Sequence, residues 1–380
     1  MSSFAVTLER ITVRQHPNAD RLELARVGLF DAVVGKGQFK TGDVVLYIPE
    51  QAILPSGIIH RLGLDGKLSG KQHNRVKAVS LRGALSQGIV APTSIVSTFP
   101  EADHYREVID ALNTAGKENL STYDFAPALG IKKWEPEIPE YMKGSIISAP
   151  ELLKWIDIEN IKRFPDIFSA GDQVTVTEKI HGVCLNATLV IEDGEVTEVA
   201  VASKGYGEKN LAFEPDEKNL YWRAVNEYNV RQLATEVAAY YGNDVKSVGI
   251  YGEVFGKGIQ DLSYGAEGKA GTPGFAVFDA YVLKADGTRF WVPSPVLRNM
   301  TTDIPMVPVL FEGDYDIEKI AEIASGKEQV SGKEMNIREG VVIRSTHEEK
   351  WVDAYANSHR KIAKFITGEY LTRSGGTEYQ

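Results

Sequence analysis

The residue with the clearest capacity for chemistry in this sequence is a lysine at the end of an alternating segment. Gln173-Val-Thr-Val-Thr-Glu178 alternates as a strand does, and Lys179-Ile-His-Gly182 follows at once. A lysine beside a strand usually lies at the surface, and nothing about Lys179 alone excludes this. The alternative is a lysine that points into a cleft, where desolvation and neighbouring cations lower the pKa of its amine and make it nucleophilic.

Charged residues recur in the strand-like segments that follow Lys179. Carboxylates and lysines inside apolar strands are unfavourable unless they are paired or bind a ligand. Together they predict a pocket with cations for a polyphosphate, carboxylates for a ribose and Mg²⁺, and an aromatic ring for a base. The segments are Ser203-Lys204-Gly205, Tyr251-Gly252-Glu253, Phe275 to Asp279, Arg338 to Arg344 and Arg360 to Phe365.

These motifs, in this order, resemble those of the covalent nucleotidyltransferases, which comprise ATP-dependent DNA ligases, RNA ligases and mRNA capping enzymes. Lys179-Ile-His-Gly182 is similar to the histidine variant of the first motif in the RNA ligase 2 family, whereas DNA ligases and capping enzymes typically have aspartate there. Gly252-Glu-Val-Phe-Gly256 with Gly258-Ile-Gln260 also resembles RNA ligases more than DNA ligases. The resemblance spans residues 153–370.

The resemblance implies an ATP-dependent polynucleotide ligase with ATP and Mg²⁺ (or Mn²⁺) as cofactors. Lys179 would attack the α-phosphate of ATP and form lysyl–AMP, the AMP would pass to an RNA 5′-phosphate, and a 3′-hydroxyl would displace it. Lys364 and Lys361 would contact the α-phosphate, and Lys204 would lie over the ribose or the end phosphate. Glu339 would hold the hydrated metal ion together with Asp279. These steps depend on in-line positioning and charge neutralisation.

The nucleoside and the RNA end would be held by other residues of the same motifs. Glu253 would accept hydrogen bonds from the ribose hydroxyls, Phe278 would stack on adenine, and Glu178 would approach the adenine edge through its backbone. His181 is either structural or handles the polynucleotide end. Cys184 stands where RNA ligase 2 proteins have asparagine, so end recognition is expected to differ.

The last motif also departs from the family pattern. It is usually K-x-K, whereas this chain has Lys361-Ile-Ala-Lys364, so Lys364 is the stronger candidate of the two.

The elements that must position these residues change character along the chain. From Gly171 on, strand-like segments and two helix-period segments (216–241 and 317–323) indicate an α+β fold. The resemblance implies a mixed α/β adenylyltransferase (ATP-grasp-like ligase) domain with antiparallel sheets over residues 151–380. The expected strands are 173–178, 183–191, 197–202, 247–255, 274–283, 289–292 and 340–344.

Residues 1–150 are expected to form a separate domain, an OB-like β-barrel followed by a polar, proline-dotted connector. His16-Pro-Asn-Ala-Asp-Arg-Leu-Glu-Leu24 resembles the opening of tRNA-binding OB-type domains. An OB-like module before the ligase domain, with only 16 residues after Lys364, resembles the Deinococcus-type RNA ligases (the RNA ligase 5 group).

A basic stripe in this first domain is a candidate nucleic-acid contact. It could meet a phosphate backbone or simply be a solvated loop. The stripe holds Arg61, Lys67, Lys71, Arg75 and Lys77. With it, the first domain would grip RNA that carries 3′-hydroxyl and 5′-phosphate ends, as a nick in duplex RNA or in an RNA–DNA hybrid.

Composition narrows the function classes further. The net charge of −10 argues against a passive coat for nucleic acid, and it is uneven: residues 1–150 have a net charge of +1 and the remainder −11. The absence of a membrane-spanning run and the single cysteine predict a cytoplasmic protein that does not bind membranes. A monomer is also expected, and a phage or bacterial host would fit this function. The alternatives are an ATP-dependent DNA ligase, a capping enzyme and a catalytically dead nucleic-acid-binding repair scaffold.

Overall fold

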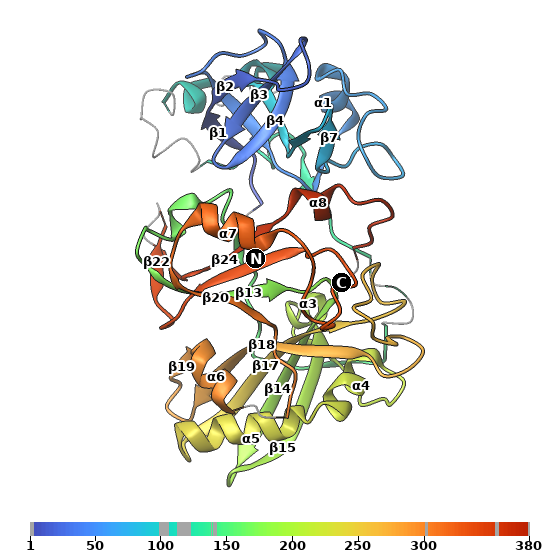
Figure 1. The fold of residues 1–380 in the computed structure, drawn as a ribbon, viewed down its shortest axis with the longest axis vertical. Coiled ribbons are helices and arrows are strands. Elements are labelled where there is room, and N and C mark those ends of the chain that lie inside the picture. The colour runs from blue at the N-terminus through green and yellow to red at the C-terminus, as the bar shows by residue number, and fades with distance from the viewer. Residues whose placement is uncertain are drawn as a thin grey trace.

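The computed structural model describes residues 4–98, 106–111, 123–137, 139, 143–300, 303–353 and 357–378. Figure 1 shows three tiers stacked along the long axis: a β-rich N-terminal domain, a middle tier around β13, β20 and β24, and a third tier in which helices cover one face of a sheet. The middle and third tiers together form the second domain. None of the described helices has the length and apolar character needed to cross a bilayer.

The N-terminal domain is built on two three-stranded antiparallel sheets. Apolar side chains that alternate along these strands, such as Leu8, Leu46 and Ala25, are buried in its core. The first sheet has the order β1 (Thr7–Arg10), β5 (Val44–Ile48), β9 (Ile89–Pro92), and the second β2 (Thr12–Gln15), β3 (Leu22–Val27), β4 (Phe30–Gly35). The described strands do not close into a hydrogen-bonded ring, so the predicted barrel is wrong in that respect.

Shorter elements complete this domain. They are α1 (Ser56–Arg61), η1 (Thr93–Thr98), the hairpin of β7 (Val79–Leu81) and β8 (Ala84–Ser86), and β6 (Ala52–Ile53) paired with β10 (Lys132–Lys133). The pairing of β10 with β6 returns the chain to the first domain before it enters the second.

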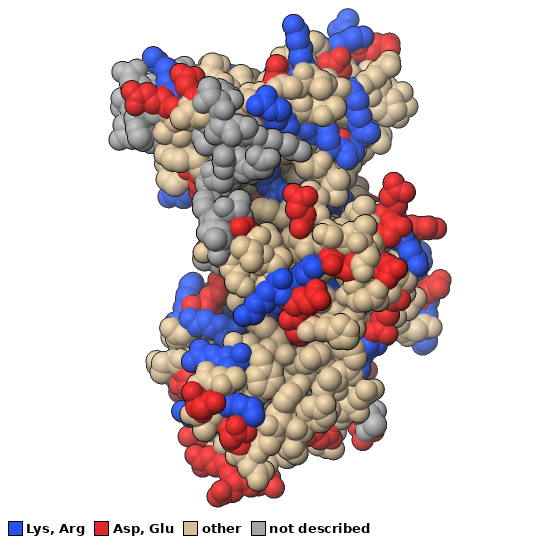
Figure 2. All heavy atoms as spheres, turned by 90° about the vertical axis from the view of Figure 1, so that its left-hand side faces the viewer, with Lys and Arg blue, Asp and Glu red and all other residues tan. Residues whose placement is uncertain are grey.

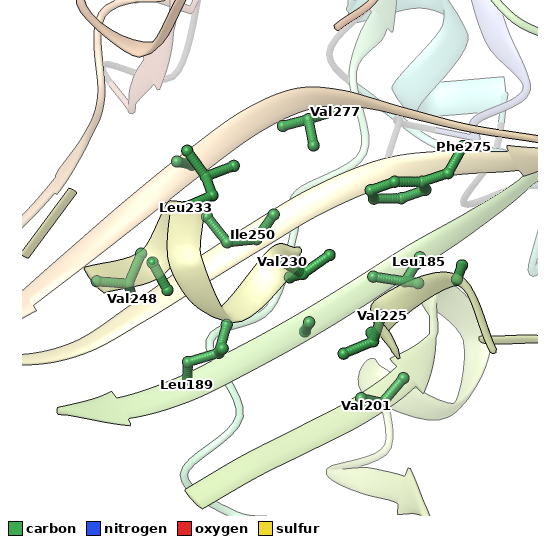
Figure 3. Close-up of a cluster of buried hydrophobic side chains, with 14 of the residues drawn as sticks. Leu185, Leu189, Val201, Val225, Val230, Leu233, Val248, Ile250, Phe275 and Val277 are labelled. Atoms are coloured by element: carbon green, nitrogen blue, oxygen red, sulfur yellow. The ribbon is translucent and has the colours of Figure 1, made fainter. Parts of the chain in front are cut away.

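The third tier is a seven-stranded antiparallel sheet covered by helices. Figure 3 shows why the two layers adhere: Leu185, Leu189 and Ile250 from the sheet meet Val230 and Leu233 from the helical side in one apolar cluster. The strand order is β11 (Ile146–Ser148), β16 (Leu211–Phe213), β15 (Glu195–Ser203), β14 (Val183–Glu192), β17 (Val245–Phe255), β18 (Gly274–Lys284), β19 (Arg289–Trp291), and the helices are α4 (Leu220–Glu227), α5 (Val230–Tyr241) and α6 (Ser294–Met300).

The middle tier is a five-stranded sheet. Its order is β12 (Glu159–Asn160), β24 (Ile362–Ile366), β21 (Gly340–Ser345), β13 (Gln173–Lys179), β20 (Val309–Asp314), and only β12 runs parallel to its neighbour. Around it lie η4 (Pro165–Ile167), α7 (Ile317–Ala324), α8 (Gly368–Leu371) and the hairpin of β22 (Lys350–Val352) and β23 (Ser358–Arg360). The short helix α3 (Lys204–Gly207) packs instead against β14, β15 and β16 of the seven-stranded sheet.

The two sheets of the second domain meet where β13 ends and β14 begins. Only Ile180, His181 and Gly182 separate the two strands. A Cβ on Gly182 would lie 2.3 Å from the carbonyl oxygen of Val254, so this close approach of the backbone to β17 requires glycine. The chain therefore changes sheets immediately after Lys179, which places that lysine at the junction.

The expected strands of the second domain all occur with small shifts at their ends, and the segment 317–323 forms α7. The segment 216–241 forms two helices rather than one, because the chain leaves the helical conformation at Tyr228 and Asn229, between α4 and α5. The border between the domains differs, because β11 pairs with β16 and therefore belongs to the second domain's sheet. It lies between Lys133 and Ile146 rather than at residue 150. On the face in Figure 2, Asp and Glu side chains gather at the lower end of the second domain, while Lys and Arg are spread over the first.

Candidate active site

A cavity of about 470 Å³ opens at the junction of the two sheets and reaches the N-terminal domain. It is lined by eight residues that the sequence predicted as site residues. These are Glu178, Lys179, His181, Lys204, Glu253, Phe278, Glu339 and Lys364. The fold thus brings together residues that are spread over 187 positions of the chain.

Lys179 is held in the cavity by a carboxylate. Its Nζ lies 2.8 Å from Oε1 of Glu339, which directly precedes β21. Burial by itself lowers the pKa of Lys179, but the negative charges of Glu339 and Glu253 outweigh it, so the pKa lies above its ordinary value. This corrects the expectation that desolvation and neighbouring cations lower this pKa: carboxylates are the decisive neighbours.

Glu253 faces the same cavity from β17. Its Oε1 accepts a hydrogen bond from the backbone N–H of Gly182, at 3.0 Å, which fixes the carboxyl group beside the nucleophile. Burial raises the pKa of Glu253 to about 7, against the opposing charge of Lys179. A carboxyl group fixed in this way can accept hydrogen bonds from hydroxyl groups of a ligand.

Two further lysines of the cavity face one carboxylate, that of Asp157. Lys204 begins α3, where the Ser203 side chain caps the helix, and its Nζ lies 3.1 Å from Oδ2 of Asp157. Nζ of Lys364, on β24, lies 3.8 Å from Oδ1 of the same residue. Burial lowers the pKa of Lys364, and the charges of Lys204 and Lys179 add to the effect. The three amines form a cationic wall suited to a polyphosphate.

Sequence reasoning missed Asp157, and Trp155 with it. Both line the cavity, but they lie at the start of the predicted ligase domain, ahead of its first expected strand at residues 173–178. Trp155 packs edge-on against Phe278, with ring centroids 5.4 Å apart and an interplanar angle of 72°. The signal was an aromatic residue and an acid two positions apart, too weak by itself to mark a site.

Asp279 does not reach the cavity. Its side chain is fully buried, its Oδ1 lies 2.8 Å from Nη2 of Arg360 and 3.2 Å from Nη1 of Arg344, and its Oδ2 accepts from Trp155. Burial alone would raise the pKa of Asp279, but the two guanidinium groups hold it below its ordinary value. The prediction that Asp279 shares a metal ion with Glu339 is therefore wrong, because both its oxygens are already engaged.

Lys361 also lies elsewhere. Its Nζ pairs with Asp172 at 2.7 Å and with Glu349 at 3.3 Å, and it does not line the cavity. The predicted contact of Lys361 with the α-phosphate is wrong, whereas Lys364 is placed where such a contact can form. The two lysines are three positions apart, so along an extended chain they face opposite sides.

His181 has a structural environment. It is buried, its Nε2 lies 2.9 Å from Asp261 and 3.1 Å from Arg373, and its Nδ1 lies 2.9 Å from the hydroxyl of Tyr370. Both ring nitrogens are thus engaged, and its backbone N–H donates to Tyr264. His181 also lines the cavity. Of the two expectations for His181, these hydrogen bonds favour the structural role, and a contact with the RNA end stays a prediction.

Glu178 points away from Lys179. Its Oε2 accepts a hydrogen bond from the backbone of Gln329 at 2.8 Å and lies 3.7 Å from Arg338. The backbone N–H of Glu178 donates to the carbonyl of Pro308, so it is not available to an adenine edge.

Cys184 is half-buried, and burial raises the pKa of its thiol, so it has no character of a nucleophile.

The basic stripe of the first domain does not act as one surface. Arg61, Lys67 and Lys71 are exposed and Lys77 is half-buried, but none of them lines the cavity. Arg75 is buried, because its guanidinium pairs with Glu378 at 2.5 Å and covers the ring of Trp134 at 3.2 Å from the centroid. The predicted contact of Arg75 with a phosphate backbone is wrong.

One atom of the site is suited to a metal ion. Oε2 of Glu339 is buried and has no hydrogen-bond partner, while its Oε1 binds Lys179. The described part of the chain has no cluster of three or more histidine, cysteine or acidic side chains that could hold a metal. A divalent cation here would therefore depend on one or two carboxylates, water and a ligand's phosphates, which is how Mg²⁺ is usually bound.

Comparison with known proteins agrees with this geometry. The sequence model of the RNA ligase family matches residues 172–366, which is more than half of the chain and includes all of the predicted site residues that line the cavity. The chain belongs to the RNA ligase family. In this RNA ligase, residues 5–93 match an OB-fold domain, so the N-terminal domain is of the OB type although its sheets stay separate.

Solved structures resemble this RNA ligase over nearly its whole length. A structure of Naegleria gruberi RNA ligase with PPi has a TM-score of 0.71 and 20% identity, covering 97% of this chain and 98% of that one. Mutants of the same protein with AMP and Mn, and with ATP and Mn, each have a TM-score of 0.71 and 21% identity over the same shares. At this identity the likeness establishes the fold. No curated protein matches the sequence.

Proposed function

We propose that this chain is an ATP-dependent RNA ligase that seals 3′-hydroxyl/5′-phosphate breaks through a lysyl–AMP intermediate on Lys179. The observation that carries the proposal is the convergence of this buried amine with Glu339 and a cationic wall in one cavity. The family supports ligation of RNA, and the similar Naegleria gruberi structures contain ATP, AMP or PPi.

In the first step, Nζ of Lys179 attacks the α-phosphorus of ATP. A phosphorus–nitrogen bond forms, the bond between the α-phosphorus and the bridging oxygen breaks, and pyrophosphate leaves with that electron pair. Because its pKa is raised, the amine must first lose a proton, and Glu339 at 2.8 Å is placed to receive it. Lys364 and Lys204 offset the charge that develops on the phosphates.

Mg²⁺ or Mn²⁺ fits the unpartnered oxygen of Glu339. When bound, such a cation would neutralise phosphate charge and offset the carboxylate charge that keeps Lys179 protonated. The adenosine would lie between Phe278, whose ring borders the cavity, and Glu253, whose carboxyl group would accept from the ribose hydroxyls. The carbonyl of Glu178 is the backbone group left to meet the adenine edge.

In the later steps, the AMP passes to an RNA 5′-phosphate, and the 3′-hydroxyl then displaces it as the strand closes. The OB-type domain ahead of the ligase match supports placement in the Deinococcus-type group (the RNA ligase 5 group) and a nicked RNA duplex or RNA–DNA hybrid as substrate. The cavity is completed by residues of a single chain, which supports a monomer, and the single cysteine suits the cytoplasm.

Incubation with ATP labelled at the α-phosphate, followed by a denaturing gel, tests the first step. We expect a labelled protein band for the wild type and none for Lys179→Ala. Lys361→Ala is the matched control, because that lysine pairs outside the cavity, and it should label like the wild type. Label in Lys179→Ala would contradict the proposal. Joining assays on nicks with RNA or DNA 3′ ends then decide the substrate.

A further inference from the structure

The cavity has a second end that the adenylation chemistry does not use. Beyond Lys179 it is lined by Glu50, Gln51, Lys133 and Trp134, all from the N-terminal domain. These residues come from two segments that are held together, because the N–H of Trp134 donates to the carbonyl of Gln51 at 2.7 Å and β10 pairs with β6. The first domain thus supplies a built wall that is continuous with the nucleotide pocket.

Trp134 is fixed in place before any ligand arrives. The guanidinium of Arg75 lies 3.2 Å from the centroid of its ring, and the Arg75 side chain is itself held by Glu378 from the C-terminal segment. One face of the indole is thereby covered by a cation, which is a strong contact for tryptophan. The half-buried side chain also borders the cavity. An aromatic ring that is immobilised in this way is a ready platform for a flat ligand.

An unsatisfied acceptor lies beside this platform. Oε1 of Glu50 is buried and has no hydrogen-bond partner, and Oε2 has only a long contact of 3.4 Å with Gln87. Burial raises the pKa of Glu50 to about 7. Buried polar atoms are nearly always satisfied by a protein group, water or a ligand. Because Glu50 precedes Gln51, whose carbonyl holds Trp134, the acceptor and the ring belong to the same wall.

We infer that this wall, Trp134 with Glu50, binds a nucleobase of the RNA strand that is being joined, close to the break. The inference rests on the proposed function and names a contact for its RNA substrate. Stacking on Trp134 would hold the base by its face, and Glu50 would accept from an amino group of the base or from a ribose hydroxyl. Stacking tolerates any base, as an enzyme that seals breaks in many sequences requires.

The charges of this wall are mixed, unlike those around Asp157. Glu50, Glu135 and Glu378 line the cavity together with Lys133 and Arg163, and Glu378 is paired with Arg75. Lys204 and Lys364, by contrast, lie around the single carboxylate of Asp157. A wall without an excess of cations attracts phosphate groups less than the lysines do, and it accepts a neutral base without charge repulsion. The two ends of the cavity therefore suit the two parts of an adenylylated RNA end, one for AMP and one for the neighbouring nucleotide.

The test combines protein variants with modified RNA. Trp134→Ala and Trp134→Phe are compared with the wild type in single-strand-break joining at subsaturating RNA, and abasic nucleotides are scanned through the positions next to the break. We expect Trp134→Ala to lower joining by roughly 5- to 150-fold, which corresponds to the loss of one stacked base. We expect Trp134→Phe, which keeps a ring, to retain most of it. Trp351→Ala, a half-buried tryptophan on β22 away from the cavity, is the matched control.

The decisive experiment combines the Trp134→Ala substitution with an abasic nucleotide in the RNA. At one abasic position the wild type should lose as much joining as Trp134→Ala does on normal RNA, and Trp134→Ala should lose nothing more there. The inference is overturned if Trp134→Ala joins RNA as fast as the wild type. It is also overturned if the loss from Trp134→Ala and the loss from the abasic nucleotide multiply at every position, or if labelling of the protein by ATP falls as much as joining does. Should Trp134→Ala not fold, Trp134→Leu, which keeps apolar bulk without a ring, replaces it. A wild type that takes up no label contradicts the proposed function itself.

Discussion

Two groups of charges in the second domain look alike in the sequence and differ completely in the structure. Around Lys179, amines and carboxylates border a cavity, and Oε2 of Glu339 has no partner. Around Asp279, Arg344 and Arg360 close on one carboxylate that is 0% exposed. We call these the open cluster and the sealed cluster. A charge inside a strand therefore indicates either a binding site or a buried ion pair, and the partners decide which.

The two clusters should respond differently to substitution. The largest effect is expected for Asp279→Ala, which leaves the buried guanidinium of Arg344 without its carboxylate. Breaking a buried ion pair by removing one partner destabilises a protein by about 3–5 kcal/mol. Denaturant unfolding measures this loss. The division into two clusters is wrong if the Asp279→Ala protein is as stable as the wild type but needs a higher metal concentration for labelling. That result would identify Asp279 as a metal ligand.

Glu339→Gln should affect the open cluster in the opposite way, with a loss of activity and little loss of stability. We expect labelling by ATP to slow by about 10- to 100-fold, the usual range when a group supporting a metal site is changed. Because Glu339 raises the pKa of Lys179, its removal should also move the rise of rate with pH toward lower pH. Measuring the rate of label formation against pH checks both the slower rate and the shift. An unshifted profile would show that Glu339 does not set the pKa of the Lys179 amine.

The open cluster should also make the stability of the protein depend on pH, through Glu253. Its pKa is raised to about 7 in the folded chain by burial, so the folded state holds a proton that the unfolded state releases near its ordinary pKa. Its contribution to stability is therefore fully present below that ordinary value and is lost as the pH rises through 7. We expect Glu253→Gln to gain about 1–2 kcal/mol relative to the wild type between pH 5 and 8. Unfolding of both proteins across this range measures the difference, and parallel curves would rule the raised pKa out.

Lys361→Ala should have the smallest effect. Its ion pairs with Asp172 and Glu349 lie toward the surface, and such pairs contribute about 0–1 kcal/mol. Thermal unfolding should show a shift within that range and labelling should be unchanged. A strong loss of labelling would show that Lys361 acts in the open cluster.

The errors about Asp279 and Lys361 share one physical cause. Neighbouring residues in a strand face opposite sides, so Phe278 in the cavity directs Asp279 away from it. The odd spacing of Lys361 and Lys364 separates them in the same way. Both outcomes follow from the period of two along a strand, which the order of the family motifs does not contain.

Other features could not be reached from the sequence. The strands of the second domain were predictable because alternation marks them, and eight of the predicted site residues line one cavity. Asp157 and Trp155 come from a polar segment without such a pattern. Arg75 looks like an exposed cation, and only the three-dimensional structure brings Glu378, 303 positions away, to pair with it. Whether two sheets close into a barrel likewise depends on long-range pairing rather than on local propensity.

Peptide mapping after reaction with ATP tests the central claim most directly. The wild-type protein is incubated with ATP and Mg²⁺, digested, and analysed by mass spectrometry under conditions that preserve phosphoramidates. We expect one adenylylated peptide, with AMP on Nζ of Lys179, and no such peptide from Lys179→Ala. An unmodified Lys179 in a protein that joins RNA, or AMP on another residue, would contradict the account.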